Sequence, residues 1–234
     1  MLEVNNISTG YGKKQVLFDI SLEIRRGSIV LLIGGNGSGK STLLKYLYRL
    51  LPRFPGDVGK ITFDGKDISY SPPAALMAKG LMYIPQKGNC FDSLTVRENL
   101  ELSGQRLLNR RKEKIRESLS AFPQLSSLQQ QKAGQLSGGE RQVLALAMAS
   151  LHTPKMILMD EPFTGLSPKN IDTVKTYIKT MNRTQGLSFI IVEHHIKESL
   201  EISSVLIGMR SGRLAGFHAI DEHFDPKVAA NILI

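Results

Sequence analysis

The chain has 234 residues, of which 41% are hydrophobic, and it carries a formal net charge of +9. No uncharged apolar stretch reaches the roughly 18 residues of a membrane-spanning helix, and the N-terminus lacks the basic-then-apolar pattern of a signal peptide. The one cysteine, Cys90, excludes an internal disulfide and fits a reducing compartment. These properties predict a cytoplasmic protein with a sizeable core. Its basic charge would suit nucleic acid or an anionic membrane surface.

Along the chain, the apolar pattern alternates between the periods of strands and helices. Strands are predicted at residues 2–8, 16–24, 28–33, 60–63, 156–159, 187–192 and 205–209, with a short final strand from Gly212. Helices are predicted from near Lys40, within 94–122, after Ser137 and at the end of the chain. This alternation indicates a parallel α/β core. We expect one domain over residues 1–234, with a helical subdomain inserted at approximately 87–152.

The strand at 28–33 leads into the segment 34–41, which reads GGNGSGKS. This fits G-x-x-x-x-G-K-[ST], in which glycines let the loop curl so that backbone N–H groups point at phosphate oxygens. Lys40 is expected to reach the β- and γ-phosphates, and the Ser41 hydroxyl to bind Mg²⁺. The alternative is a glycine-rich turn that only caps a helix. The predicted ATP-binding residues of this segment are Gly34, Gly35, Asn36, Gly37, Ser38, Gly39, Lys40, Ser41 and Thr42.

The strand at 156–159 ends in two adjacent carboxylates, Asp160 and Glu161. Beside a phosphate-binding loop, a carboxylate at a strand end can hold Mg²⁺ directly or through water. Asp160 is expected to have this role. Glu161 is expected to polarise the attacking water as general base. The alternative is a surface turn that happens to carry two acidic side chains.

The segment 136–142 reads LSGGERQ and precedes the predicted long helix. Ser137 and Glu140 have the spacing of a capping box, which explains a helix start but not two adjacent glycines. Exposed N–H groups at a helix start bind anions, and this would explain them. With the loop at 34–41 and the carboxylates after 159, the segment resembles the signature of the ATP-binding cassette (ABC) family. The residues that the resemblance assigns to the ATP of an opposing subunit are Ser137, Gly138 and Gly139.

The resemblance covers nearly the whole chain and implies an α/β fold. The expected fold is a P-loop NTPase with a RecA-like parallel core, an N-terminal antiparallel β subdomain and an inserted helical subdomain. ATP and Mg²⁺ are the implied ligands, and ATP hydrolysis coupled to transport across a membrane is the implied activity. The sequence departs from the family pattern at Gly35, where Pro is usual, and at Ser167, where most members have Asp.

Three more residues match family positions. Tyr11 would stack on the adenine, Gln86 would bind Mg²⁺ and sense the γ-phosphate, and His194 would hydrogen-bond the γ-phosphate and the attacking water. Their ordinary alternatives are a turn tyrosine, a loop amide and a structural histidine. His195 is a neighbouring candidate, but the family pattern places the histidine directly after the residue at Glu193.

Weak local signals resemble the ATP-binding subunits of branched-chain amino acid importers and the related lipopolysaccharide-export ATPase. They are the opening 1–4, the segment 165–168 and the ending 225–228. The resemblance implies an importer of amino acids or similar small polar solutes, with lipopolysaccharide export, or a soluble non-transport ABC ATPase, as the alternatives. The implied partners are a second copy or a paralogous subunit, transmembrane permease subunits and, for an importer, a periplasmic solute-binding protein. No nucleic acid is expected, and the chain would lie on the cytoplasmic face of the membrane.

Two surface features remain. The stretch 106–116 carries six basic residues against Glu113, and it is either a solvated helix face or a surface near lipid headgroups. The segment 87–103 is a candidate groove for a cytoplasmic helix of a permease, with ordinary core packing as the alternative. The residues expected to line this groove are Phe91, Leu94, Val96 and Leu100.

Overall fold

The computed structural model describes residues 1–233. Its central sheet has six strands in the order β10-β9-β3-β8-β7-β6. Five of these strands run parallel, and β10 pairs antiparallel with β9 at one edge. The strands are β3 (Ile29–Ile33), β6 (Leu81–Ile84), β7 (Met156–Asp160), β8 (Ser188–Val192), β9 (Val205–Arg210) and β10 (Arg213–Ala219). The sequence therefore predicted the parallel core correctly but missed the short edge strand β6.

Both faces of the parallel sheet are covered, which explains why its inner strands are continuous apolar runs. Every residue of β7 is buried. Ile157 and Met159 pack into the cluster that includes helices α5 (Gly138–Ser150) and α6 (Pro168–Gln185). Met156 and Leu158 face the opposite cluster, which includes helix α1 (Lys40–Leu47). Burial on both faces fixes the strand ends, and with them the loops that follow.

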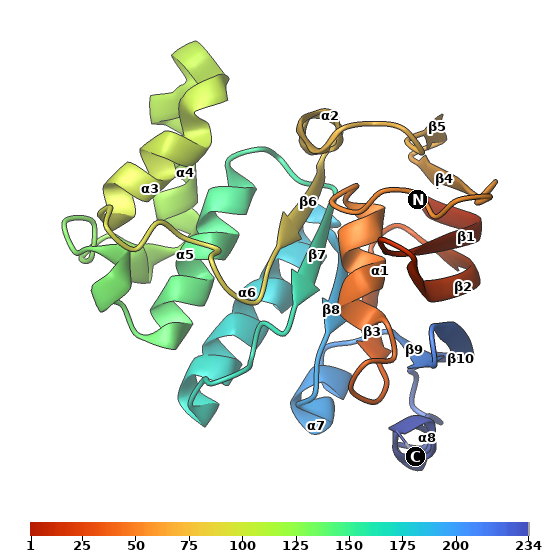
Figure 1. The fold of residues 1–234 in the computed structure, drawn as a ribbon. Helices are drawn as coiled ribbons and strands as arrows, with labels where there is room; N and C mark the ends of the chain where they lie inside the picture. The colour runs from red at the N-terminus through yellow and green to blue at the C-terminus, as the bar shows by residue number, and fades with distance from the viewer. Residues whose placement is uncertain (234) are drawn as a thin grey trace.

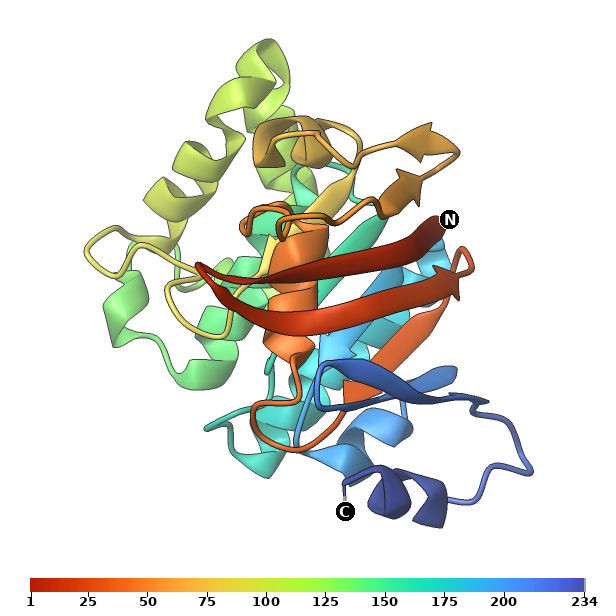
Figure 2. The same ribbon diagram turned by 45° about the vertical axis from the view of Figure 1, so that its right-hand side comes forward.

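A second sheet of four antiparallel strands has the order β2-β1-β4-β5. Figure 2 shows strands β1 and β2 crossing in front of helix α1. Pairing continues into the hairpin turn, where Tyr11 is opposite Lys14, so both strands are longer than the sequence predicted. The strands are β1 (Leu2–Tyr11), β2 (Lys14–Ile24), β4 (Lys60–Phe63) and β5 (Lys66–Asp67). This sheet confirms the expected N-terminal antiparallel β subdomain.

A buried carboxylate joins this sheet to helix α1. The Asp57 side chain is only 1% exposed. One oxygen accepts hydrogen bonds from the backbone N–H groups of Ser8 (3.0 Å) and Gly59 (3.1 Å), and the other accepts from Tyr46 Oη (2.8 Å) and Arg53 Nε (2.9 Å). Burial alone would raise the pKa of Asp57, but the hydrogen bonds outweigh it and lower the pKa. The ionised side chain therefore holds helix α1 against the sheet.

The helices of the 87–152 segment lie on the side of β6 and β7 away from the antiparallel sheet (Figure 1). A capping box between Thr95 and Glu98 starts α3. One face of this helix is buried. Val96 and Leu100 lie one turn apart on that face and are fully buried in the core, so the prediction that they line a groove was wrong. Besides α5, the segment contains α3 (Val96–Ser103), the 3₁₀ helix η1 (Gly104–Arg110) and α4 (Arg111–Ala121).

The remaining helices are all short: α2 (Pro73–Ala78), α7 (Ile196–Leu200), α8 (Lys227–Leu233) and the 3₁₀ turns η2 (Pro123–Leu125) and η3 (Ala133–Gln135). Within residues 1–233, no helix combines the length and apolar character that crossing a bilayer requires. The carboxyl ends of parallel strands meet at one edge of a sheet, where α/β proteins bind their ligands. The loops after β3, β7 and β8 therefore come together there.

Candidate functional site

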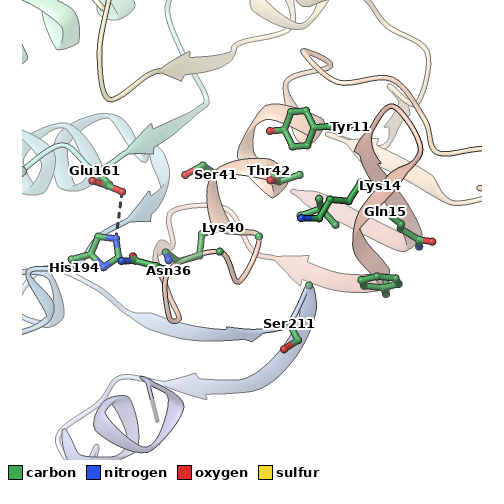
Figure 3. Close-up of a pocket in the computed structure, with 15 residues that line it drawn as sticks. Tyr11, Lys14, Gln15, Asn36, Lys40, Ser41, Thr42, Glu161, His194 and Ser211 are labelled. Carbon is green, nitrogen blue, oxygen red and sulfur yellow. Dashed lines mark ion pairs between the residues drawn. The ribbon is translucent and has the colours of Figure 1, made fainter.

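A cavity of about 540 Å³ lies where these loops meet. Figure 3 shows Lys40 near its centre, with Glu161 and His194 on one side and Tyr11 and Lys14 on the other. Lys40 follows β3, Glu161 follows β7 and His194 follows β8. The predicted residues that line the cavity are Tyr11, Asn36, Gly37, Gly39, Lys40, Ser41, Thr42, Glu161 and His194. The predicted residues of the loop and carboxylate sites that do not line it are Gly34, Gly35, Ser38, Gln86 and Asp160. Of these, Gln86 and Asp160 contact Glu161 and Ser41, which do.

The loop at 34–40 is folded tightly against β9. A Cβ at Gly34 would lie 2.2 Å from the carbonyl oxygen of Met209, so only glycine fits there. At Gly35, by contrast, nothing lies within 4 Å of an added Cβ, which agrees with a family that usually has Pro there. Lys40 Nζ donates to the carbonyl oxygens of Gly34 (2.9 Å) and Gly35 (3.1 Å). The ammonium group is thus held inside the loop.

Several features fit an anionic ligand in this loop. Lys40 is 6% exposed, and burial lowers its pKa while the charges of Glu161 and Asp160 oppose that shift. The Ser38 hydroxyl is buried and has no hydrogen-bond partner among the described residues. The N-cap residue of helix α1 is Gly39, which provides no side-chain cap, so the N–H groups of the first turn remain available. A buried cation and available N–H groups together suit phosphate oxygens.

The pair Ser41 and Asp160 provides oxygen ligands suited to Mg²⁺. Ser41 Oγ donates to Asp160 Oδ1 at 2.8 Å, and Tyr83 Oη donates to Asp160 Oδ2 at 3.3 Å. Burial raises the pKa of Asp160, and the hydrogen bond from Ser41 opposes this. Among residues 1–233, no group of three or more His, Cys, Asp and Glu side chains could hold a metal alone. A hydroxyl and one carboxylate fit a Mg²⁺ ion that completes its shell with phosphate and water.

Glu161 is the meeting point of the remaining predicted residues. Gln86 Nε2 donates to Glu161 Oε2, and Thr164 Oγ1 donates to the same oxygen at 3.1 Å. His194 Nε2 lies 3.3 Å from Glu161 Oε1 (Figure 3). Glu161 itself has φ 50°, a conformation that a non-glycine residue rarely adopts. Three loops therefore converge on one carboxylate beside the cavity.

One residue of the site was missed as such from the sequence. The Glu193 side chain is buried and accepts hydrogen bonds from the backbone N–H groups of Phe163 (2.5 Å), His194 (2.8 Å) and His195 (3.1 Å). Burial raises the pKa of Glu193, and these hydrogen bonds oppose the shift. Glu193 ties the loop after β7 to the loop after β8, so it positions Glu161 and His194. An acidic residue at the end of an otherwise apolar strand was the signal for it.

Part of the cavity wall was also unpredicted. It comes from the hairpin after Tyr11 and from the turn between β9 and β10, which are distant in sequence. No local motif marks these positions. They are Lys14, Gln15, Val16, Phe18, Ser211 and Gly212.

The segment at 137–139 does not line this cavity. Ser137 and Gly138 are exposed, and the predicted capping box between Ser137 and Glu140 is present. A Cβ at Gly138 would lie 2.8 Å from Leu166 Cδ2, and one at Gly139 would lie 2.5 Å from Asn170 Cγ. The two glycines thus have a packing reason that the sequence did not suggest, because the starts of α5 and α6 approach closely. Gly138 is exposed, whereas Gly139 is buried against α6.

Comparison with known proteins agrees with this geometry. The model of the ABC transporter family matches residues 17–164. A protein of Archaeoglobus fulgidus named as a probable branched-chain amino acid transport ATP-binding protein is 37% identical, over 92% of this chain and 90% of its own length. The lipopolysaccharide export system ATP-binding protein of Haemophilus influenzae is 35% identical, over 86% of this chain and 83% of its own.

Solved structures show the same fold. A nucleotide-free ATP-binding cassette of an ABC transporter superposes with a TM-score of 0.85 at 29% identity, covering 99% of this chain and 97% of that one. The ADP conformation of the cassette MJ1267 gives 0.84 at 29% identity, over 99% and 94%. The chain belongs to the ABC transporter family. It is an ATP-binding, ATP-hydrolysing subunit that powers a transporter.

Proposed function

We propose that this chain powers an importer of amino acids or similar small polar solutes. The main support for its role as the ATP-hydrolysing subunit is that Gln86 and His194 converge on Glu161, beside the loop that holds Lys40. The choice of solute rests on relatives named for branched-chain amino acid transport, from Archaeoglobus fulgidus and Pseudomonas aeruginosa. The 35% identical relative named for lipopolysaccharide export keeps export of a lipid-linked solute as the second candidate.

In this proposal, the loop at 34–42 binds the phosphates of ATP. Backbone N–H groups donate to phosphate oxygens, and Lys40 contributes a buried positive charge. Tyr11 is 48% exposed on the opposite wall and stacks on the adenine, a contact that needs no base-specific hydrogen bond.

Ser41, Asp160 and Gln86 would hold Mg²⁺. When bound, the ion would neutralise charge that develops on the phosphate oxygens. Ser41 and Asp160 already lie within hydrogen-bond distance of each other, and Tyr83 orients the second oxygen of Asp160. Gln86 is an amide that can exchange its contact with Glu161 for a contact in the loaded site.

Glu161 accepts a proton from the attacking water as general base. His194 lies on the other side of the same carboxylate, where it can hold the water and the terminal phosphate oxygen. Glu193 keeps both loops in register through its hydrogen bonds to their backbone N–H groups. The buried Glu193 carboxylate thus fixes the backbone of the loops that carry the proton-transfer side chains Glu161 and His194.

The start of α5 is proposed to complete the ATP site of a second subunit, either another copy or a paralogue. Ser137 and Gly138 are exposed at a helix N-terminus that does not reach the chain's own cavity. Two subunits arranged head to tail would therefore form two composite sites.

Mixing two inactive variants tests this arrangement. Lys40→Ala removes the loop cation, and Ser137→Arg blocks the helix start. In a mixed dimer, one site receives both defects and the other receives none. Random pairing should restore about a quarter of wild-type ATPase activity if the two sites turn over independently. No recovery on mixing would rule out a site shared between subunits. If each chain completed its own ATP site, both variants would stay inactive and mixing them would restore nothing.

The permease is proposed to dock in a groove of about 320 Å³ between the parallel sheet and α3 and α5. Phe91 is 53% exposed and lines this groove together with Tyr83 and Met148. A charge at the groove, Met148→Glu, should abolish co-purification with the permease while sparing ATP binding. The chain would then act on the cytoplasmic face of the membrane, with a periplasmic solute-binding protein delivering the solute.

Uptake of radiolabelled leucine and other amino acids by cells tests the solute class. Cells that produce the chain with its co-purifying permease subunits should accumulate label, and cells with Glu161→Gln should not. Equal uptake with wild type and variant, for every amino acid tried, would contradict amino-acid import. Export of a lipid-linked solute would then be favoured.

A further inference from the structure

A second concave site lies apart from the nucleotide cavity. It is a pocket of about 270 Å³ enclosed by α2, η1, the start of α4 and the segment that follows α5. Figures 1 and 2 show α2 and α4 at the end of the molecule opposite the C-terminal helix α8. Nothing in the nucleotide site involves these residues.

The polar lining of this pocket is mostly cationic. Arg106, Arg110 and Lys114 line it, as does His152, and within residues 1–233 no carboxylate does. Lys114 is held in place, with its side chain only 14% exposed. Arg106 and Arg110 line the same pocket, so both guanidinium groups can reach one ligand.

The acidic neighbours neutralise these cations only in part. Glu113 lies 3.8 Å from Arg110, and Glu117 lies 2.6 Å from Lys114. Both carboxylates are more than half exposed and lie outside the pocket. Arg106 makes no ion pair among the described residues. The pocket therefore retains positive charge that an anion of suitable shape would balance.

An apolar residue projects beside this charge. Leu108 is 80% exposed and has φ 47°, which a leucine adopts only at a cost in backbone strain. It lies between Arg106 and Arg110 in sequence, next to the pocket-lining Leu107. An exposed leucine flanked by basic side chains is the pattern of a segment that contacts the headgroup region of a membrane.

We propose that this pocket binds the phosphate of an anionic lipid headgroup, with Leu108 in contact with the acyl chains below it. Arg106 and Arg110 form paired hydrogen bonds to the phosphate, and Lys114 contributes a further charge. The site rests on the proposed function only in that the subunit works beside a membrane, and it adjoins the permease groove, with which it shares Met77 and His152. It orients the subunit on the bilayer rather than retaining it there, because a few exposed cations give weak, salt-sensitive binding.

Vesicle co-sedimentation of the full chain tests the proposal. Wild type should bind vesicles that contain phosphatidylglycerol more tightly than vesicles of phosphatidylcholine alone. Each basic residue at an anionic surface strengthens binding about five-fold, so Arg106→Gln with Arg110→Gln should weaken it about 25-fold. The matched control is Lys179→Gln with Arg183→Gln, which removes two exposed cations at the same spacing from α6. This control should lose less than about five-fold.

Equal binding by wild type and the Arg106/Arg110 variant would overturn the proposal, as would an equal loss in the α6 control. The first result would mean that the pocket is not used, and the second that net charge alone drives binding. Thermal melts and ATPase rates identical to wild type establish that the pocket variant is folded. A wild-type chain that ignores anionic vesicles would also overturn the proposal. It would favour an acidic protein segment as the partner.

Leu108→Ser separates a lipid headgroup from free phosphate. This variant should bind anionic vesicles about tenfold more weakly, because the leucine no longer enters the apolar layer. Inorganic phosphate should raise the melting temperature equally with and without Leu108→Ser. Both proteins carry Lys40→Ala in this measurement, so that the nucleotide loop does not bind the phosphate. Unchanged vesicle binding by Leu108→Ser, together with phosphate stabilisation that requires Arg106, would mean a soluble phosphate and refute the lipid assignment.

Discussion

Replacing Glu161 with Gln should separate ATP binding from hydrolysis. The carboxylate accepts hydrogen bonds from Gln86 and Thr164 and faces His194, and its side chain is 20% exposed. Glutamine keeps the shape and one acceptor oxygen but cannot take a proton. Loss of general-base action should slow hydrolysis about 10²–10⁴-fold, which corresponds to roughly 3–5 kcal/mol in the barrier.

The same substitution leaves the phosphate-binding loop intact. Lys40 is hydrogen-bonded to Gly34 and Gly35 and makes no hydrogen bond to Glu161. The Kd for ATP should therefore change less than about threefold. With binding retained and turnover blocked, ATP and Mg²⁺ should convert the variant into a stable dimer.

Single-turnover phosphate release measures the chemical step, and size-exclusion chromatography with ATP measures the dimer. Glu113→Gln is the control, since it makes the same change at an exposed carboxylate of α4. A Glu161→Gln protein that hydrolyses ATP at more than about a tenth of the wild-type rate would refute the base assignment. A slow variant that remains monomeric with ATP would refute the sandwich arrangement instead.

Three further changes test other parts of the molecule. Lys40→Ala should weaken ATP binding at least about tenfold in a fluorescent-nucleotide titration, because phosphate charge then lacks its buried cation; unchanged affinity would contradict the role. Asp57→Asn should destabilise the fold by about 3 kcal/mol at pH 7 in urea denaturation. Because the pKa of Asp57 is lowered in the fold, its contribution to the free energy of unfolding is fully present above the ordinary pKa of aspartate. That contribution is lost as the pH falls through the lowered pKa, so the stability of the variant should decrease less in acid than that of wild type; the same decrease in both proteins would argue against this role. Tyr83→Phe should raise the Mg²⁺ concentration for half-maximal ATPase activity about tenfold with unchanged thermal stability, because Asp160 loses its second hydrogen bond; the same Mg²⁺ dependence would remove Tyr83 from the site.

The motifs of this site could be found from sequence because each depends on local structure. The loop at 34–41 follows an apolar strand, and Asp160-Glu161 and His194 follow two others. Parallel strands bring such loops together whatever their spacing in the chain, so the convergence was also foreseeable. The side chains of Tyr11, Lys40, Glu161 and His194 accordingly line one cavity.

What the sequence could not supply depends on packing between distant segments. Val96 and Leu100 are apolar on a helix, and only the partner of that helix decides whether they form core or groove. Glycine is needed at position 139 because Asn170, at the start of another helix, leaves no room for a side chain. The hairpin residues Val16 and Phe18 enter the cavity wall because the antiparallel sheet folds over α1. None of these contacts leaves a local pattern.

The strand that the sequence missed also connects the proposed permease groove to the nucleotide site. Tyr83 in β6 lines the permease groove and donates to Asp160, and Gln86 just beyond β6 donates to Glu161. Only Ile84 and Pro85 separate these two residues. A displacement of β6 by a docked permease helix would therefore move the partners of both carboxylates together, and closure around ATP would move the groove in return. Because such coupling is reciprocal, a groove variant that shifts the Mg²⁺ dependence should also bind the permease differently in the ATP-bound and ATP-free states.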